Sequence, residues 1–279
     1  MSYSLNALYR TIGISKQAVL QYERRQIIFD ANLLQLVAEA DELREEHPGC
    51  GVEKMYYTLK PGFIGRDRFV DTMMQLGYRL KRKKNYRRTT IAGKLYYPSL
   101  IKGMKVDAPS TIWQSDITYI PIGDKHYYVV LIIDVYTKNI VGYSVTDHMR
   151  ATANVSALKM ALKQHKAPQI HHSDRGSQYT YKGYVELLEK HGTSISMATS
   201  AQDNAYAERI NRTIKEEYLD HWKPKSLSQL KMMIKKAVKN YNQKRIHNQL
   251  DRTTPIQFEN QLVEQKGKSI TIFNNQILN

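Results

Sequence analysis

Residues 111–147 read "TIWQSDITYIPIGDKHYYVVLIIDVYTKNIVGYSVTD" and predict three consecutive β-strands. In the first third of this stretch, side chains alternate with the period of two that gives a strand two different faces. The alternation puts Trp113 and Ile117 on one face, and Gln114 and Asp116 on the other. The next run, "HYYVVLIIDVYT", is almost entirely apolar, as expected for a strand that is covered on both faces. Short turns separate the strands, so we expect an antiparallel meander.

The residues that follow alternate between helical and extended patterns. We expect helices at about 151–164, 181–192 and 204–219, and strands at 168–174 and 193–197. The resulting order, β-β-β-α-β-α-β-α, is typical of a ribonuclease H-like α/β fold, in which helices flank a mixed five-stranded sheet. We assign residues 109–222 to this domain.

Three acidic residues are predicted to meet at one edge of the sheet. Asp116 lies within the first strand, and Asp174 ends the fourth strand in "HHSDRGSQYT". Asp174 has two interpretations, because it could cap the following helix or face a cleft at the carboxyl end of its strand. If the fourth strand lies parallel to the first and beside it, the two aspartates are neighbours. Glu208 then lies close to them, in the first turns of the last helix.

Converging carboxylates repel one another unless a cation lies between them. Mg²⁺ prefers hard oxygen ligands and keeps positions open for water and phosphate oxygens. Two such ions about 3.5–4 Å apart can activate an attacking oxygen and stabilise a leaving one. We therefore expect Asp116, Asp174 and Glu208 to be catalytic and to bind two Mg²⁺ ions, for which Mn²⁺ can substitute.

Basic residues near Glu208 suit DNA phosphates. Arg212 and Lys215 follow it at i+4 and i+7 on the same helical face, although Arg212 could instead pair with Glu208. Glu216 and Glu217 fall near the far end of this helix and are expected to be ordinary surface charges.

Other polar residues near the predicted site have less specific interpretations. His171 and His172 could support the metal ligands from behind or contact the substrate, but an exposed histidine is more often incidental. Asp134 closes the second strand and is interpreted as a turn residue.

Helical and basic segments flank the predicted catalytic domain. Residues 1–30 have helix-turn-helix spacing with Gly13 in the turn and Ser15 as an N-cap, and residues 31–78 predict a second helical DNA-binding domain. Residues 79–108 form a basic linker that is either solvated or bound along a phosphate backbone. Its predicted DNA contacts are Lys81, Arg82, Lys83, Lys84, Arg87 and Arg88. Residues 223–279 form a basic helical C-terminal region, in which Arg245 and His247 are also predicted DNA contacts.

Composition points to the same class of partner. The 279 residues carry a net charge of +16 with a pI near 9.6, which favours a polyanion such as nucleic acid. The single cysteine, Cys50, excludes an internal disulfide and a cysteine-based zinc site, and it suits a reducing cytoplasm. Apolar runs are too short to predict a membrane span. We expect a soluble, intracellular protein.

Several motifs, in order, resemble one family. "WQSDITYI", "HHSDRGSQYT" and "DNAYAERINRTIKEE", followed by "YNQKRIHNQL" and "TPIQF", are similar to the DDE transposases of the IS-three insertion-sequence family, specifically the OrfB product with its integrase catalytic core. The resemblance covers roughly residues 32–258 and implies that Asp116, Asp174 and Glu208 are the metal-binding triad. Between Asp174 and Glu208 lie 33 residues (208 − 174 − 1), two fewer than is usual in the family.

The resemblance implies a metal-dependent transposase that cleaves DNA at the ends of an insertion sequence and joins the 3′-OH to another strand. It also implies a bacterial cytoplasmic protein that is associated with the nucleoid when bound to DNA. Its partners would be double-stranded DNA in the terminal inverted repeats and the target, further copies of itself, and an upstream-frame partner or fusion. Two alternatives remain: a ribonuclease H-fold nuclease or resolvase, and a non-catalytic DNA-binding regulator. The flanking domains disfavour the first alternative, and the complete acidic triad disfavours the second.

Overall fold

The computed structural model describes residues 4–80, 96–264 and 270–271. The chain divides into two compact units, Met1–Lys81 and Arg82–Asn279, and each is described by itself.

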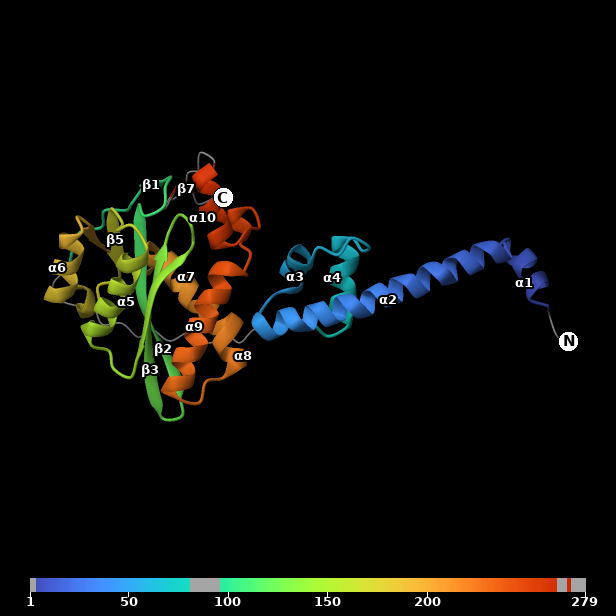
Figure 1. Ribbon diagram of the computed structural model, residues 1–279, viewed down its shortest axis with the longest axis horizontal. Helices are drawn as coiled ribbons and strands as arrows, with labels where there is room; N and C mark the ends of the chain where they lie inside the picture. Colours follow the sequence, from blue (N-terminus) through green and yellow to red (C-terminus); the bar gives the residue numbers. More distant parts are fainter. Residues whose placement is uncertain (1–3, 81–95, 265–269, 272–279) are drawn as a thin grey trace. The chain divides into compact units, whose positions relative to one another are not determined.

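The first unit is helical in its described residues (Figure 1). A core of apolar side chains, with Met55, Phe69 and Met73 fully buried, packs α3 and α4 against the second half of α2. The helices are α1 (Leu5–Ile12), α2 (Lys16–Glu46), α3 (Val52–Leu59) and α4 (Arg66–Gln75).

The turn between α1 and α2 confirms two local predictions. Gly13 adopts the left-handed conformation with φ 73°, and the Ser15 side chain accepts a hydrogen bond from Ala18 N at the start of α2. The predicted boundary at residues 30 and 31, however, falls within α2, which continues for 31 residues. Asp30, Ala31 and Asn32 do not interrupt the helix, because none of them has the backbone restriction of proline.

The second unit contains the predicted mixed sheet. Its spatial order is β4-β3-β2-β5-β6, in which β2 pairs antiparallel with β3 and parallel with β5. The pairs β3–β4 and β5–β6 are antiparallel and parallel, respectively. The ribonuclease H-like topology is therefore confirmed. The strands are β2 (Ile112–Ile122), β3 (Lys125–Asp134), β4 (Ile140–Thr146), β5 (Ile170–Ser173) and β6 (Ser194–Met197).

Helices cover both faces of this sheet, which explains the nearly continuous apolar sequence of β3 (Figure 1). Val129, Leu131 and Ile133 pack toward α7 and α9, whereas Val130 and Ile132 pack toward α5 and α6. The helices are α5 (Ala151–Gln164), α6 (Lys182–Lys190), α7 (Ala205–Ile214) and α9 (Leu227–Gln243).

The predicted helix at 204–219 is not a uniform α-helix. A 3-10 turn, η2 (Ala201–Asn204), precedes α7, and a π-helical turn, η3 (Lys215–Leu219), leads into the short α8 (Asp220–Trp222). A π turn widens the helix locally and changes the direction of the side chains beyond it, and such turns are frequent at functional sites. The residues of η3 therefore do not follow the helical wheel of α7.

Shorter elements complete the second unit. Strand β1 (Lys105–Val106) pairs antiparallel with β7 (Ile270–Thr271) in a separate two-stranded sheet. The other short elements are η1 (Ser177–Tyr179), η4 (Asn248–Leu250) and α10 (Pro255–Glu264).

Candidate active site

The register of the sheet places Asp116 next to Asp174. Strands β2 and β5 run parallel, and their last registered pair is Ser115 with Ser173. Asp116 directly follows Ser115, and Asp174 directly follows Ser173. The two aspartates therefore lie next to each other where the pairing of β2 with β5 ends. The prediction that the fourth strand lies parallel to the first and beside it is confirmed.

Glu208 lies in the first turn of α7, which packs against β2 and β3 through Ala207, Ile210 and Ile214. The remaining face of the helix carries its polar side chains. Glu208 is exposed, whereas Asp116 and Asp174 are half-buried. Solvent therefore reaches the glutamate freely and the aspartates in part.

The three carboxylates influence one another's ionisation. Burial raises the pKa of Asp116 to about 7, and the nearby charges of Asp174 and Glu208 add to this shift. Burial also raises the pKa values of Asp174 and Glu208, and the charge of Asp174 raises that of Glu208 further. In the absence of a cation, the site thus disfavours three simultaneous negative charges.

Local hydrogen bonds partly offset this cost. Asp116 Oδ1 accepts from Ile117 N at 2.9 Å, and Asp116 Oδ2 accepts from Asn211 Nδ2 at 2.9 Å. Asp174 Oδ1 accepts from Gly176 N at 3.0 Å, within the turn that leaves β5. Each carboxylate of this pair is thus oriented by a hydrogen bond and still has lone pairs for another ligand.

The carboxylates share one electrostatic environment but are not gathered around one point. In the described part of the chain, no group of three or more His, Cys, Asp or Glu side chains has the arrangement to hold a metal ion. The donor set nevertheless suits a hard divalent cation, because it consists of carboxylate oxygens whose mutual repulsion a cation would relieve. The residues therefore fit Mg²⁺ in chemistry, and they would have to approach one another to bind it.

The two basic residues predicted beside Glu208 behave differently. Lys215, in η3, is half-buried and close enough to Asp116 for that charge to raise its pKa, although burial lowers the pKa overall. Arg212 is exposed, and its charge lowers the pKa of Glu208. Both of the interpretations considered for Arg212 therefore remain consistent with its position.

His171 and His172 are buried and hydrogen-bonded within the fold, which excludes the exposed, incidental position considered for them. Burial lowers their pKa values to about 3 and about 4, so both rings are neutral at physiological pH. His171 Nε2 is 2.9 Å from the Tyr184 hydroxyl, and His172 Nδ1 is 2.8 Å from the Ser196 hydroxyl.

Arg245 was predicted to contact DNA, but its guanidinium is used within the fold. Its Nε and Nη2 atoms each donate to the Glu217 carboxylate at 2.7 Å, and its side chain is 13% exposed. Arg245 Nη1 also lies 3.1 Å from His247 Nε2, and the His247 ring packs edge-on against Tyr241. The ion pair between Arg245 and Glu217 therefore joins the end of α9 to η3. Glu217 is thus not the ordinary surface charge that the sequence predicts.

Asp134 is the turn residue that its position predicted. It is buried, and its carboxylate accepts hydrogen bonds from Ser110 N, Tyr136 N, Thr137 N and Trp113 Nε1. Four donors stabilise this side chain at the end of β3, so its role is structural.

Six predicted DNA contacts lie outside the described residues: Lys81, Arg82, Lys83, Lys84, Arg87 and Arg88. Sequence reasoning did not identify Asn211, whose amide holds Asp116. The helical spacing could have identified it, because Asn211 follows Glu208 at i+3 and therefore lies on a neighbouring part of the same helical face.

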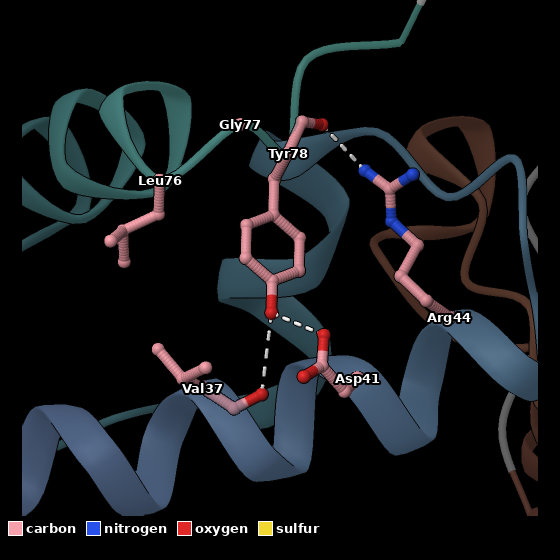
Figure 2. A pocket seen from close by; sticks show the side chains of 6 residues that line it. All are labelled: Val37, Asp41, Arg44, Leu76, Gly77 and Tyr78. Carbon is pink, nitrogen blue, oxygen red and sulfur yellow. Dashed lines mark hydrogen bonds between the residues drawn. The ribbon is translucent and has the colours of Figure 1, made fainter.

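A pocket lies in the first unit, lined by residues of α2 and of the segment that follows α4 (Figure 2). Tyr78 fills its centre, where the hydroxyl donates to the Asp41 carboxylate and the carbonyl accepts from Arg44 Nη2 at 2.7 Å. Asp41 is the one acidic residue in the lining of this pocket, whereas three electrostatically coupled carboxylates lie near the β2–β5 edge. That edge is therefore the candidate active site.

Among the described residues, every helix is too short or too polar to cross a lipid bilayer.

Comparisons with known proteins identify the family of the chain. Two integrase core domain models match residues 106–202 and 191–255. The chain is 34% identical to the insertion element IS600 31 kDa protein of Shigella sonnei over 70% of its own length and 75% of that protein. It is also 34% identical to the transposase for insertion sequence element IS904 of Lactococcus lactis, over 63% of its length and 71% of that transposase.

Among solved structures, one match is the HTLV-2 integrase catalytic core domain in complex with magnesium. The TM-score is 0.46 at 22% identity, over 54% of this chain and 96% of that one. The sequence relatives establish the family: the chain belongs to the insertion-sequence transposases that carry an integrase core domain.

Proposed function

We propose that Asp116, Asp174 and Glu208 bind two Mg²⁺ ions and that this site cleaves DNA at the ends of an insertion sequence and joins the freed 3′-OH to a second strand. The observation that carries this proposal is the electrostatic coupling of three carboxylates, supplied by β2, β5 and α7, at one edge of the sheet. Ordinary folding would not favour such a set, because each charge raises the free energy of the others.

Bound Mg²⁺ would activate the attacking oxygen and stabilise the leaving oxygen of the phosphodiester. The chain's own residues would hold and orient the reactants. Asn211 fixes the Asp116 carboxylate through Oδ2, and Gly176 N fixes Asp174 through Oδ1. Lys215 places a cation close to Asp116, where it could hold a DNA phosphate beside the reacting bond.

We further assign the chain to the IS-three branch of these transposases, on the ordered motifs around Asp116, Asp174 and Glu208. In this assignment its substrates are the terminal inverted repeats and target DNA, and it acts as a homo-oligomer on DNA. The α1–turn–α2 segment and the basic linker would supply sequence-independent or end-specific contacts. Mn²⁺ would replace Mg²⁺, and an upstream-frame product could act with the chain.

The test separates DNA binding from chemistry. Asp116→Asn and Asp174→Asn should abolish Mg²⁺-dependent cleavage and strand transfer on a DNA carrying an element end, while gel-shift affinity stays near that of the wild type. Full cleavage by either variant would refute the metal-site assignment. A wild-type protein that cleaves this DNA but never forms a joined strand product would instead support a nuclease of the same fold.

A further inference from the structure

Gln114 connects the strand that carries Asp116 to the helix that carries Glu208. It is fully buried on β2, two residues before Asp116 and therefore on the same face of the strand. Its Oε1 atom accepts hydrogen bonds from Tyr206 N at 3.1 Å and from Ala207 N at 3.3 Å. Its Nε2 atom donates to Asp203 O at 3.2 Å.

These contacts satisfy the N-terminal end of α7. The first N–H groups of a helix lack partners within the helix, and a side-chain oxygen just before the helix usually accepts from them. Asn204 occupies that position, but its Nδ2 atom donates to Ser115 O at 3.0 Å instead. The cap of α7 therefore comes from β2, and the residue before α7 is bonded back to β2.

These reciprocal hydrogen bonds hold the start of α7 against β2 close to Glu208 and Asp116. The two capped amides belong to Tyr206 and Ala207, and Glu208 is the next residue. On the strand, Ser115 receives the Asn204 amide, and Asp116 is the next residue. Loss of the Gln114 hydrogen bonds or of the Asn204–Ser115 hydrogen bond would shift the carboxylates of Asp116 and Glu208 relative to each other.

We propose that Gln114 is a positioning residue that sets the spacing between Asp116 and Glu208 and thereby the affinity of the site for a divalent metal. This inference rests on the proposed metal-binding role of the triad. Glutamine suits the position because its amide supplies an acceptor for two backbone N–H groups and a donor for one carbonyl. Methionine has a similar length and fills a similar space, but it lacks those groups.

Asn242 provides a matched control elsewhere in the same unit. Its side-chain amide also bridges a helix and a strand, since Nδ2 donates to Ile140 O and Oδ1 accepts from Ile140 N, both at 3.0 Å. Asn242→Leu therefore removes a comparable amide tie, but between α9 and β4. Both Gln114→Met and Asn242→Leu should lower the thermal midpoint, because each leaves backbone groups without partners.

The decisive measurement is Mn²⁺ binding to the full-length chain, by electron paramagnetic resonance of free Mn²⁺. We expect Gln114→Met to raise the Kd for Mn²⁺ by about 10- to 100-fold, as is typical when a residue that orients metal ligands is removed. Asn242→Leu should keep the wild-type Kd at a temperature where both variants are folded. Asn204→Ala, which breaks the reciprocal tie and leaves Gln114 in place, should also raise the Kd.

The reference variant is Asp116→Asn, which tests the triad itself. If Asp116→Asn weakens Mn²⁺ binding and Gln114→Met does not, the role of Gln114 is refuted and the metal site stands. If Asp116→Asn binds Mn²⁺ like the wild type, the proposed metal site itself fails. Should Gln114→Met not fold, Asn204→Ala decides the question, and a wild-type Kd in that variant would also overturn the inference.

Discussion

Arg245 and Glu217 form a two-pronged ion pair between the end of α9 and the π-helical turn η3. Arg245 Nε and Nη2 donate to the two oxygens of Glu217 at 2.7 Å, and the side chains are only 13% and 19% exposed. The Glu217 carboxylate raises the pKa of Arg245 against the opposing effect of burial. The planar guanidinium matches the carboxylate in this geometry, and this fit makes the pair stronger than a surface salt bridge.

Removing one partner of this pair should destabilise the fold. Glu217→Gln leaves the Arg245 charge nearly buried without its counter-ion, and we expect a loss of about 3 kcal/mol in the free energy of unfolding. The measurement is chemical denaturation of the full chain. Glu216→Gln is the matched control, since Glu216 is the exposed neighbour and should change stability by less than about 0.5 kcal/mol. Equal stability of the two variants would show that the pair contributes nothing.

The contrast between Glu217 and Asp116 shows what the sequence could predict. Asp116 is recognisable from the sequence because a carboxylate in a central strand costs free energy unless it is paired or binds a metal. The order of the elements also predicts the parallel pairing of β2 with β5. Glu217 was misjudged because an ideal helix was extended through η3, where the π turn redirects the side chains. Periodicity detects a helix, but it does not detect an added residue in one turn.

Interactions between distant segments were equally hidden. The amides of Gln114 and Asn211 are 89 and 95 residues away from their partners Asp203 and Asp116. Nothing in the local sequence specifies such interactions, because any polar side chain on the same face would show the same pattern. The boundary expected at residue 30 falls inside α2, because Asp30 and Asn32 are weak helix formers but neither breaks a helix as proline does.

Asp116→Asn should stabilise the metal-free protein at neutral pH. Burial and the neighbouring acids raise the pKa of Asp116 to about 7, so the folded state binds its proton more tightly than the unfolded chain, where the pKa is about 3.9. The ionised carboxylate therefore costs stability progressively as the pH rises from about 4 to about 7. Asn keeps the shape and removes this cost. The Asn211 amide can turn so that its Oδ1 atom, which has no hydrogen-bond partner among the described residues, accepts from the new NH₂ group. Thermal denaturation in EDTA across this pH range should show that the thermal midpoint of the variant rises relative to that of the wild type as the pH increases.

Asp134→Asn should have the opposite effect, although burial raises the pKa of Asp134 as well. Its two oxygens accept from Ser110 N, Trp113 Nε1, Tyr136 N and Thr137 N. Asn replaces one oxygen by an NH₂ group that faces donors, so at least one buried N–H loses its partner, at a cost of about 1–3 kcal/mol. At pH 7, the thermal midpoint of Asp116→Asn should therefore be higher than that of the wild type, and the midpoint of Asp134→Asn should be lower. A stable Asp134→Asn protein would remove the structural role assigned to that carboxylate.

The basic linker should bind DNA phosphates. Replacing Lys81, Arg82, Lys83 and Lys84 together with glutamine should flatten the plot of log K against log salt, by up to about 0.9 for each duplex phosphate that the variant no longer neutralises. Gel shifts at a series of salt concentrations measure this slope.

A control with the same change in charge is available on α9. Its sequence contains four lysines and no Asp or Glu, and the lysines are exposed: Lys231, Lys235, Lys236 and Lys239. Replacing these four with glutamine also removes four positive charges. Equal flattening by both variants would mean that net charge, not the linker, determines the slope.

The choice of the third acid gives the last prediction. Glu208 lies in the first turn of α7, where the charge of Asp174 raises its pKa, whereas Glu216 lies eight residues later in η3 and is exposed. At a rise of about 1.5 Å per residue, that interval carries Glu216 about 12 Å along the helix, far beyond the roughly 2 Å of a metal–oxygen bond. Glu208→Gln should therefore abolish cleavage and strand transfer, and Glu216→Gln should keep most of both activities. Glu217 is excluded from this comparison because its loss would weaken the fold through Arg245. An active Glu208→Gln protein together with a folded, inactive Glu216→Gln protein would move the third ligand from α7 to η3.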